Sequence, residues 1–374
     1  MPTKIEWTDE TWNPITGCTL VSEGCTNCYA ARLAATRLKH HPSRKGLARL
    51  NAAGVAKFTG EVRLNEQWLP QPLRWKRPRM IFVCAHGDLF HEDVPDEWID
   101  QVFAIMALCP QHTFQLLTKR PERMREYCSD FRSQQRIAKT LLDMVIAEKL
   151  SVTCMYEDHW PVKGVGNVDW PDYVKMKNWP LPNLWLGTSI EDQETADARI
   201  PHLLKTPAAI RFVCAEPMLS PVDLYNGDPD PRLGGIRARA IYLGDWWEPG
   251  DNSDEPPHHG VDWVIVGGES GANVDPMHPD WARSLRDQCA AAQVPFFFKQ
   301  WGNWKPGHYS DSQFTITFDP SDGPRRGMTL GQPPHPTSYV HDWQDGTVSV
   351  SVKKSEAGRL LDGVEHNAMP ERQS

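Results

Sequence analysis

The sequence lacks any run of about 18 apolar residues, the length that a membrane-spanning helix requires. Its first seven residues, Met-Pro-Thr-Lys-Ile-Glu-Trp, also lack the apolar core of a secretory signal peptide. Both absences predict a cytoplasmic protein. An excess of positive charge is missing too, because the net charge of the 374 residues is −8. Any surface that binds nucleic acid must therefore be a local patch.

A disulfide framework and a zinc-protease motif are also missing. The chain has nine cysteines, an odd number, and six of them stand singly along the sequence. This pattern indicates a reducing compartment and predicts that these six thiols are structural side chains, which pack as small buried hydrophobes. The 14 histidines include no HExxH spacing.

Three cysteines do cluster, in the loop of residues 18–29. Cys18, Cys25 and Cys28 are spaced C-x6-C-x2-C, with Gly17 and Gly24 in front of the first two. The glycines allow tight turns that could bring the sulfurs around one point. Three thiolates form a typical soft-ligand set for an iron–sulfur cluster or for zinc, and a three-ligand site leaves one metal position open for chemistry. Buried free thiols or a disulfide are the alternatives.

Short apolar runs that end in polar residues alternate with amphipathic helices over most of the chain. Near-continuous apolar strands of this kind indicate a parallel sheet covered on both faces. Six runs, with one strand before Cys18, predict an α/β fold with a full or partial TIM-like (β/α) barrel; a doubly wound open sheet is the alternative. The runs are 80–84, 114–118, 184–188, 210–214, 263–266 and 294–298, and the expected helices are 29–39, 96–108, 133–149 and 279–292.

A polar residue follows each of these strands at an equivalent position. Such positions surround one axis in a parallel barrel, so we expect these side chains to line a single pocket with the open face of the cysteine site. Cations in that pocket suit an anionic substrate, and a partly desolvated Glu216 suits an acid or a base. A rim of ion pairs is the alternative interpretation. The residues are Asp88, Lys119, Ser189, Glu216, Glu269 and Lys299.

The barrel is expected over residues 1–302, with insertions near 151–182 and 225–261. A short strand is expected within the second insertion, at 238–243. Residues 303–374 form a C-terminal appendage with strand-like patches at 314–318 and 348–352.

Two basic stretches stand out against the acidic composition. Residues 74–79, Arg-Trp-Lys-Arg-Pro-Arg, interleave cations with an aromatic ring, and residues 39–45 add further cations. Such interleaving suits phosphate contacts with base stacking. A solvated lead-in to the second strand is the simpler interpretation.

Several motifs carry a resemblance to a known family. Trp12–Cys18 through Cys28–Ala30 resembles the phage-type three-cysteine-motif proteins, a family of unknown function that looks like radical SAM enzymes. The likeness continues over most of the chain, in Asp88–His91, Leu117–Pro121, Gly267–Gly271, Phe297–Gly302 and, more weakly, Gly358–Gly363.

The resemblance implies a [4Fe–4S] cluster on the three cysteines and a reductive cleavage of S-adenosylmethionine. The resemblance also implies a reductant protein or a separately encoded partner protein. Our first hypothesis adds a nucleotide or nucleic acid as the substrate. Within this hypothesis we expect Glu216, Lys299 and Lys119 to be the catalytic residues, and Asp88, Tyr29, Ser189 and Glu269 to bind the cofactor.

The sequence departs from the radical SAM pattern in three places. The commonest radical SAM spacing is C-x3-C-x2-C, whereas the first gap here is six residues. In that pattern an aromatic residue precedes the last cysteine, whereas Tyr29 follows it here. The Gly267-Gly268-Glu269 element follows a late strand rather than the second, so Asp88 is the better candidate for the cofactor ammonium group. Two other functions stay open: a zinc-dependent enzyme or module with a three-thiolate site, and a phage-associated nucleic-acid-binding protein with a structural cluster.

Overall fold

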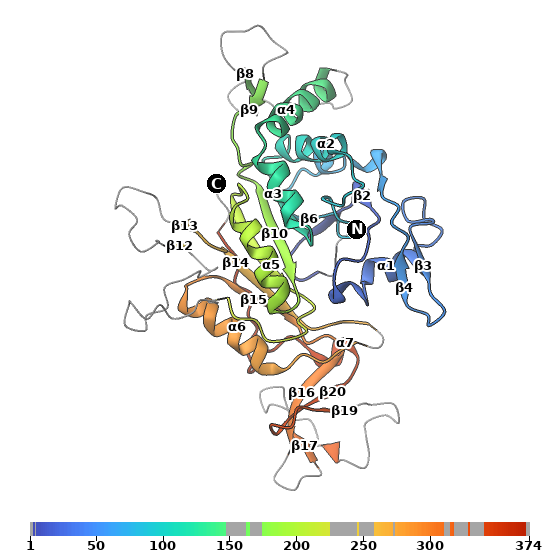
Figure 1. Ribbon diagram of the computed structural model, residues 1–374, viewed down its shortest axis with the longest axis vertical. Coiled ribbons are helices and arrows are strands. Elements are labelled where there is room, and N and C mark those ends of the chain that lie inside the picture. The colour runs from blue at the N-terminus through green and yellow to red at the C-terminus, as the bar shows by residue number, and fades with distance from the viewer. Residues whose placement is uncertain are drawn as a thin grey trace.

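The computed structural model is built around a seven-stranded parallel sheet (Figure 1). The strands, in spatial order, are β1 (Glu10–Trp12), β6 (Met80–Val83), β7 (Thr113–Thr118), β10 (Leu184–Ile190), β11 (Ile210–Ala215), β14 (Trp263–Gly267) and β15 (Phe296–Gln300). The structure describes residues 3, 5–146, 162–164, 174–224, 245–246, 258–271, 274–309, 315–317, 328–329 and 340–371.

The spatial order of these strands follows their order in the sequence without reversal. A doubly wound sheet would reverse its strand order at a switch point, so that alternative is wrong. The sheet curls into a half-barrel, and β1 and β15 are not paired with each other in the described part of the chain. The expectation of an α/β fold with a partial barrel is therefore confirmed. These strands do not form a closed TIM barrel.

Alternate residues of each strand belong to two separate apolar layers. Ile81 and Val83 of β6 join the larger layer, and Met80 and Phe82 join the smaller one. This alternation is the period of an extended strand. The larger layer lies beneath the helices α2 (Asp96–Ala107), α3 (Pro121–Ser129), α4 (Phe131–Ile146), α5 (Gln193–Leu204) and α6 (Pro279–Ala291).

The smaller layer is closed by segments from both ends of the chain rather than by a helix. The ring of Trp7 lies 4.7 Å from that of Phe82 and 6.2 Å from that of Trp263. Trp263 Nε1 donates a hydrogen bond of 2.9 Å to the carbonyl of Ala368, and Phe297 pairs with Asn367. The face of the sheet opposite the helices is therefore a packed aromatic core.

The expected helices are present with small shifts at their ends. α1 (Tyr29–Ala35) is shorter than expected, and α4 begins two residues earlier. The chain after Glu191 forms one continuous helix, α5, which a capping box of Asp192 and Thr195 starts and which retains Pro201 in its last turn. Pro201 has no N–H and so removes one backbone hydrogen bond from this turn, but it does not end the helix.

The remaining elements are short and peripheral. The described residues include three 3₁₀ helices, η1 (Glu23–Cys25), η2 (Glu66–Trp68) and η3 (Pro72–Arg74). The two-stranded antiparallel pairs are β2 (Ile15–Thr16) with β5 (Arg63–Leu64), β3 (Ala48–Leu50) with β4 (Ala56–Phe58), β8 (Val162–Gly164) with β9 (Val174–Met176), and β12 (Asp245–Trp246) with β13 (His258–His259). The expected strand at 238–243 and most of both insertions lie outside the described residues.

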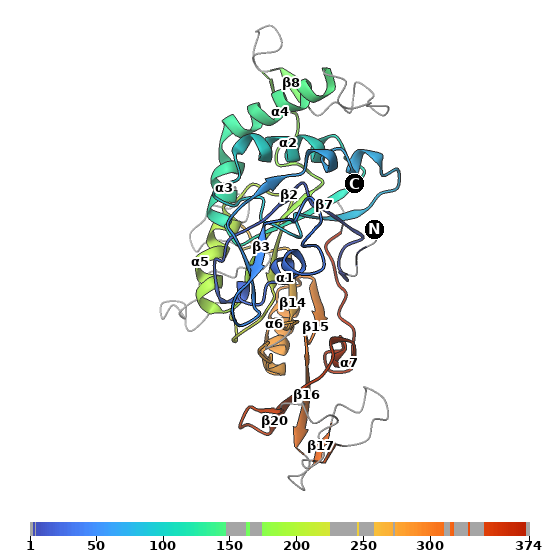
Figure 2. The same cartoon turned by 90° about the vertical axis from the view of Figure 1, so that its right-hand side faces the viewer.

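The C-terminal appendage holds a second, antiparallel sheet below the first (Figures 1 and 2). Its strands, in spatial order, are β18 (Met328–Thr329), β17 (Thr315–Thr317), β16 (Trp304–Tyr309), β20 (Thr347–Ser351) and β19 (Val340–Asp342), and α7 (Lys354–Ala357) follows. The chain then returns to the main sheet, where Phe298 N donates to the carbonyl of His366. In the described part of the chain, no helix is both long and apolar enough to cross a membrane.

Candidate functional site

The three-cysteine loop lies across the edge of the half-barrel where the parallel strands end. Ser22 Oγ donates to Glu191 Oε1 at 2.9 Å, after β10, and Asn27 Nδ2 donates to Glu269 Oε1 at 3.1 Å, after β14. The Tyr29 hydroxyl donates to the carbonyl of Ala85 at 2.5 Å, after β6. The loop is thus fastened to the ends of three strands, at the edge that (β/α) folds use for active sites.

Both glycines of the loop are required by close backbone approach. Gly17 has φ +97°, and a Cβ there would lie 2.0 Å from the carbonyl oxygen of Glu61. A Cβ at Gly24 would lie 2.4 Å from Cγ of Glu191. The chain can therefore pack against the Glu61 backbone at Gly17, and against the end of β10 at Gly24, only because these positions lack side chains.

The thiols of Cys18, Cys25 and Cys28 are free and half-buried, and their environments differ. Burial, with the nearby charge of Asp88, raises the pKa of Cys18 to about 12. Burial also raises the pKa of Cys28, although hydrogen bonds from backbone N–H groups at the start of α1 lower it in part. For Cys25, burial is outweighed by the ammonium of Lys119 and by hydrogen bonds from the loop, so its pKa is lowered. Cys25 is the thiol that most readily becomes a thiolate ligand.

The arrangement of the donors separates a single zinc ion from a cluster. Tetrahedral zinc binds sulfur at about 2.3 Å, which brings its sulfur ligands within about 4 Å of one another. In the described part of the chain the three cysteine sulfurs do not form a group within 4.8 Å. Each cysteine of a [4Fe–4S] cluster binds a different iron, so its sulfurs stand farther apart. In the described residues the three sulfurs therefore do not form the closely spaced group that one zinc ion needs.

A compact group of metal-type ligands does occur elsewhere, at His278, Asp280 and Asp345. His278 Nε2 lies 3.0 Å from Asp345 Oδ2, and His278 Nδ1 accepts a hydrogen bond from the backbone N–H of Asp280. Both ring nitrogens are thus used to cap α6 and to hold the β19–β20 turn. This group is part of the fold rather than of the candidate site.

Arg120 contacts the cysteine loop from the end of β7. Its Nη1 lies 3.6 Å from Cys18 Sγ and 3.2 Å from Asp88 Oδ2. Its Nη2 donates to Thr19 Oγ1 at 2.5 Å, and its Nε donates to Glu92 Oε2 at 2.5 Å. Four contacts fix the guanidinium group, which places a positive charge beside the first cysteine.

Asp88 is a fully engaged carboxylate. Its Oδ1 accepts from Thr118 Oγ1 at 2.7 Å and from the Phe90 N–H at 3.0 Å. Its Oδ2 accepts from the Lys119 N–H and from Arg120, both at 3.2 Å. Since a carboxylate offers about four acceptor positions, Asp88 joins the loop after β6 to the end of β7 and has no free position for a cofactor ammonium group.

Glu191 is the central residue that the sequence analysis did not assign to the site. Its side chain is 1% exposed. It accepts hydrogen bonds from Ser22 of the loop, from the ammonium of Lys119, and from Arg199 Nη1 at 3.0 Å. Lys119 therefore lies between a buried carboxylate and the thiols of the loop, and burial lowers its pKa. Arg199 also donates to the carbonyl of Ser189 at 2.7 Å.

Glu216 and Lys299 form a second ion pair at the same edge of the sheet. Lys299 Nζ lies 2.7 and 2.8 Å from the two carboxylate oxygens of Glu216, and Gln300 Nε2 adds a contact at 3.3 Å. Burial disfavours the charged form of Lys299, but the attraction of the Glu216 carboxylate is stronger than this effect. The pKa of Lys299 is therefore raised. Lys299 is thus a fixed cation and not a neutral amine nucleophile. Cys214 lies beside the pair, with its Sγ 3.9 Å from Glu216 Oε2.

Gly268 and Glu269 have mainly structural contacts. A Cβ at Gly268 would lie 2.4 Å from the carbonyl oxygen of Trp301, so the glycine permits two loops to touch. Glu269 accepts from Asn27 and from the N–H of Asp275 at 3.0 Å. The structure therefore brings the six polar residues to one edge of the sheet, but as separate groups. Asp88 with Arg120, Lys119 with Glu191, and Glu216 with Lys299 are ion pairs of the rim.

The other sequence features lie apart from this edge. Five of the six isolated cysteines, Cys84, Cys109, Cys128, Cys214 and Cys289, are buried free thiols. The sixth, Cys154, lies outside the described residues. The basic stretch 74–79 precedes β6 and therefore stands at the opposite edge of the parallel sheet, where Arg79 pairs with Glu10. It cannot belong to the same binding surface as the cysteine loop.

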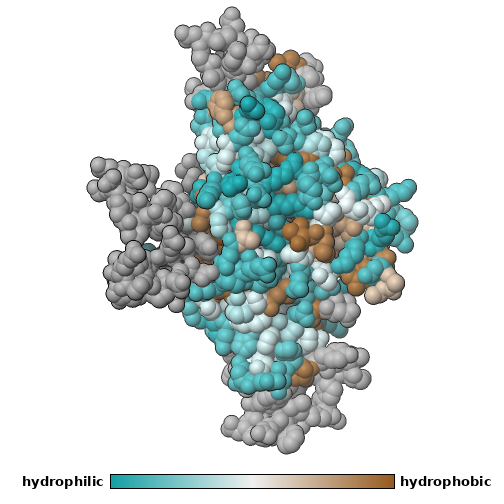
Figure 3. Space-filling view, in the orientation of Figure 1, coloured by the Kyte–Doolittle hydropathy of each residue, from teal (hydrophilic) through white to brown (hydrophobic). Residues whose placement is uncertain are grey.

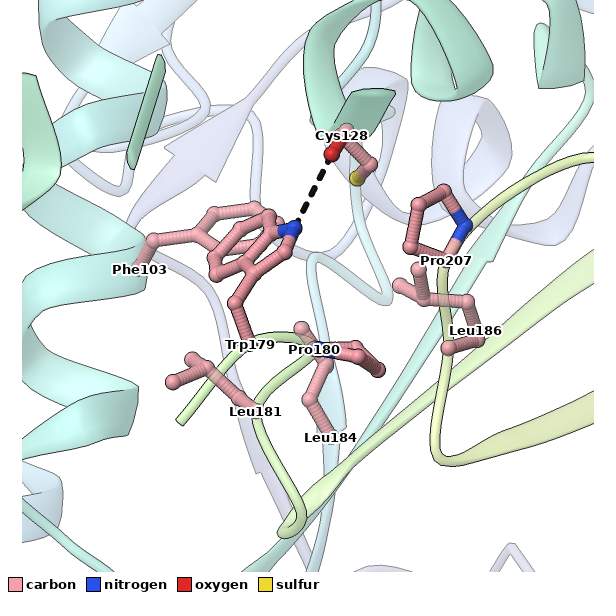
Figure 4. A pocket seen from close by; sticks show the side chains of 9 residues that line it. Phe103, Cys128, Trp179, Pro180, Leu181, Leu184, Leu186 and Pro207 are labelled. Atoms are coloured by element: carbon pink, nitrogen blue, oxygen red, sulfur yellow. Dashed lines mark hydrogen bonds between the residues drawn. The ribbon is translucent and has the colours of Figure 1, made fainter. Parts of the chain in front are cut away.

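A small apolar cavity lies between the helices and the sheet (Figure 4). Phe103, Trp179 and Leu186 help to line it, and Trp179 Nε1 donates to the Cys128 carbonyl at 3.1 Å. Its volume of about 10 Å³ leaves room for one water molecule at most. It is a packing feature of the core and not a substrate site.

Comparison with known proteins gives a family without a described function. No curated protein and no solved structure matches the chain. One family model, described as "Protein of unknown function (DUF5131)", matches residues 2–370. Because that match covers nearly the whole chain, the protein belongs to the DUF5131 family.

Proposed function

We propose that this protein is an iron–sulfur enzyme in which Cys18, Cys25 and Cys28 hold a [4Fe–4S] cluster and S-adenosylmethionine is cleaved reductively. The observation that carries the proposal is the position of three free thiols in one loop, fastened across the carboxyl ends of a parallel half-barrel. Three cysteine ligands leave one iron of such a cluster open for a cofactor.

When bound, the cluster would supply an electron and the cofactor a 5′-deoxyadenosyl radical. The chain's own residues would hold and orient these groups. Glu191 and Glu269 anchor the loop through Ser22 and Asn27, and Arg120 directs an N–H toward Cys18. Hydrogen bonds of this kind fix metal ligands and tune the metal that they hold.

The four residues expected to bind the cofactor divide into two groups. Asp88, Tyr29 and Glu269 have hydrogen-bond partners that hold the loop and its supports, so we assign them to positioning. The Ser189 hydroxyl makes no hydrogen bond within the described part of the chain and is 5% exposed as a residue. Ser189 therefore remains the candidate for a direct cofactor contact.

On the substrate side, Lys299 and Lys119 provide cations at one edge of the sheet. Lys299 stays protonated beside Glu216, and Lys119 lies beside Glu191. Such cations would orient an anionic group, for example a phosphate of a nucleotide or nucleic acid, while Glu216 could exchange a proton once a substrate replaces its lysine partner.

The proposal is tested by anaerobic purification, reduction with dithionite and addition of S-adenosylmethionine. We expect 5′-deoxyadenosine and methionine, measured by liquid chromatography and mass spectrometry, from the parent chain and none from Cys25→Ser. A brown protein that forms no 5′-deoxyadenosine would favour the structural-cluster alternative. A colourless protein that contains zinc would favour the zinc alternative.

A further inference from the structure

The segment that directly follows the cysteine loop is basic throughout. Residues 29–58, which we call the basic lobe, comprise α1 and the β3–β4 hairpin that packs on it. They contain seven Lys or Arg and no Asp or Glu, whereas the whole chain has 40 of the former and 48 of the latter. Figure 1 shows these elements projecting to the right of the sheet. A strongly positive surface thus stands on an acidic protein.

Most of these cations are exposed and have no carboxylate partner in the described part of the chain. There are two exceptions. Arg44 is buried and donates to His86 and Ser43, and Lys57 is half-buried. The exposed members are Arg32, Arg37, Lys39, Lys45 and Arg49. Side chains of like charge on one small unit repel one another, and a polyanion would relieve that repulsion.

An aromatic ring stands where the basic lobe meets the cysteine site. Tyr29, the residue after Cys28, is 48% exposed, although its hydroxyl is tied to the carbonyl of Ala85. The hydrogen bond holds the hydroxyl end of the side chain, while about half of the residue stays exposed to solvent. A fixed ring beside a basic surface is the combination that binds single-stranded nucleic acid, through base stacking and phosphate contacts.

The composition of the surface favours nucleic acid over an acidic protein. Protein interfaces have an apolar centre and are depleted in lysine, whereas nucleic-acid interfaces are rich in cations. Within the basic lobe the large apolar side chain that is well exposed, besides Tyr29, is Leu50 at 49%. Figure 3 shows a mainly hydrophilic surface on this face, with small separate apolar patches.

We propose that the basic lobe binds single-stranded nucleic acid and that Tyr29 stacks on a base next to the cysteine loop. This deepens the proposed function by naming its substrate class, but the binding itself does not require a cluster. The nucleic-acid strand would contact cationic side chains on α1, on the segment 36–47 and on the β3–β4 hairpin, and would reach the edge of the half-barrel at Cys28.

The test is fluorescence anisotropy with a labelled single strand of about 12 nucleotides, as DNA and as RNA, titrated with the full chain between about 50 and 200 mM salt. The test variant is the triple Arg37→Gln, Lys39→Gln, Arg49→Gln. The matched control is the triple Arg74→Gln, Lys76→Gln, Arg77→Gln. It removes the same charge from exposed residues at the opposite edge of the sheet. Circular dichroism verifies that both variants are folded.

We expect the slope of log affinity against log salt to fall by about 2 in the test variant, since each lost phosphate contact removes about 0.7 for a single strand. The control triple should keep the parent slope. Tyr29→Leu should weaken binding at least fivefold without changing the slope, and Tyr29→Phe should retain most of the affinity. Equal loss in both triples, or no binding of the parent at about 50 mM salt, would overturn the proposal.

The same titration with Cys18→Ser, Cys25→Ser, Cys28→Ser separates this inference from the proposed function. Binding that persists in this triple variant supports the basic lobe even if no cluster is ever found. An iron-containing parent that cleaves S-adenosylmethionine but binds no single strand would overturn the inference and leave the proposed function in place.

Discussion

Replacing Glu191 tests how the cysteine loop is held. The carboxylate is almost fully buried and accepts hydrogen bonds from Ser22, Lys119 and Arg199. Glu191→Ala leaves two cations without their partner, and breaking a buried pair in this way costs about 3–5 kcal/mol. The Lys119 side chain is 18% exposed, so water screens part of the loss. We therefore expect a decrease of about 3 kcal/mol in the free energy of unfolding.

The assay is urea unfolding followed by tryptophan fluorescence and by circular dichroism. A decrease of about 3 kcal/mol is a large share of the roughly 5–15 kcal/mol that stabilises a typical domain. Glu191→Gln should cost about half as much, because the amide oxygen can still accept a hydrogen bond from Ser22 or Arg199. The control is Asp143→Ala, which removes an exposed carboxylate on α4 and should stay within about 0.5 kcal/mol of the parent. If Glu191→Ala unfolds like that control, Glu191 is not the anchor of the loop.

Three further predictions concern individual residues. Arg120→Met should lower the reduction potential of the cluster in a spectroelectrochemical titration, because it removes the N–H that points at Cys18 Sγ, and an unchanged potential would refute that role. Cys289→Ala should leave the iron content unchanged, and iron loss from a folded variant would show that the ligands are misassigned. Burial and the neighbouring Arg44 lower the pKa of His86 to about 4. Since the unfolded histidine binds its proton near pH 6.5, the free energy of unfolding should fall as the pH drops from about 6.5 to about 4. His86→Gln should flatten this dependence in urea titrations, and an identical slope would contradict it.

The strands could be predicted because each is a short, nearly uninterrupted apolar run. Strands buried on both faces have this pattern, and their alternation with helices fixed their parallel direction. The extent of closure was not predictable from these runs. It depends on Trp7 and on residues 366–368, which fill and border the sheet from both ends of the chain and have no strand pattern of their own.

The edge that carries the site was also predictable, since polar residues follow the strands in order. Their partners were not, because hydrogen bonds such as Ser22 to Glu191 join residues far apart in the sequence. Glu191 carried one usable signal, its place just before the Asp192 cap of α5, at the carboxyl end of an apolar strand. The basic lobe had a clearer signal, because no acidic residue interrupts its seven cations.

The most direct test of the central claim is the iron and acid-labile sulfide content of the anaerobically purified protein. A [4Fe–4S] cluster on Cys18, Cys25 and Cys28 predicts about four irons and four sulfides per chain, and their loss when these cysteines are replaced by serine. A parent chain with no sulfide and about one zinc, or with iron that survives the triple replacement, would contradict the assignment of these three thiols to a cluster.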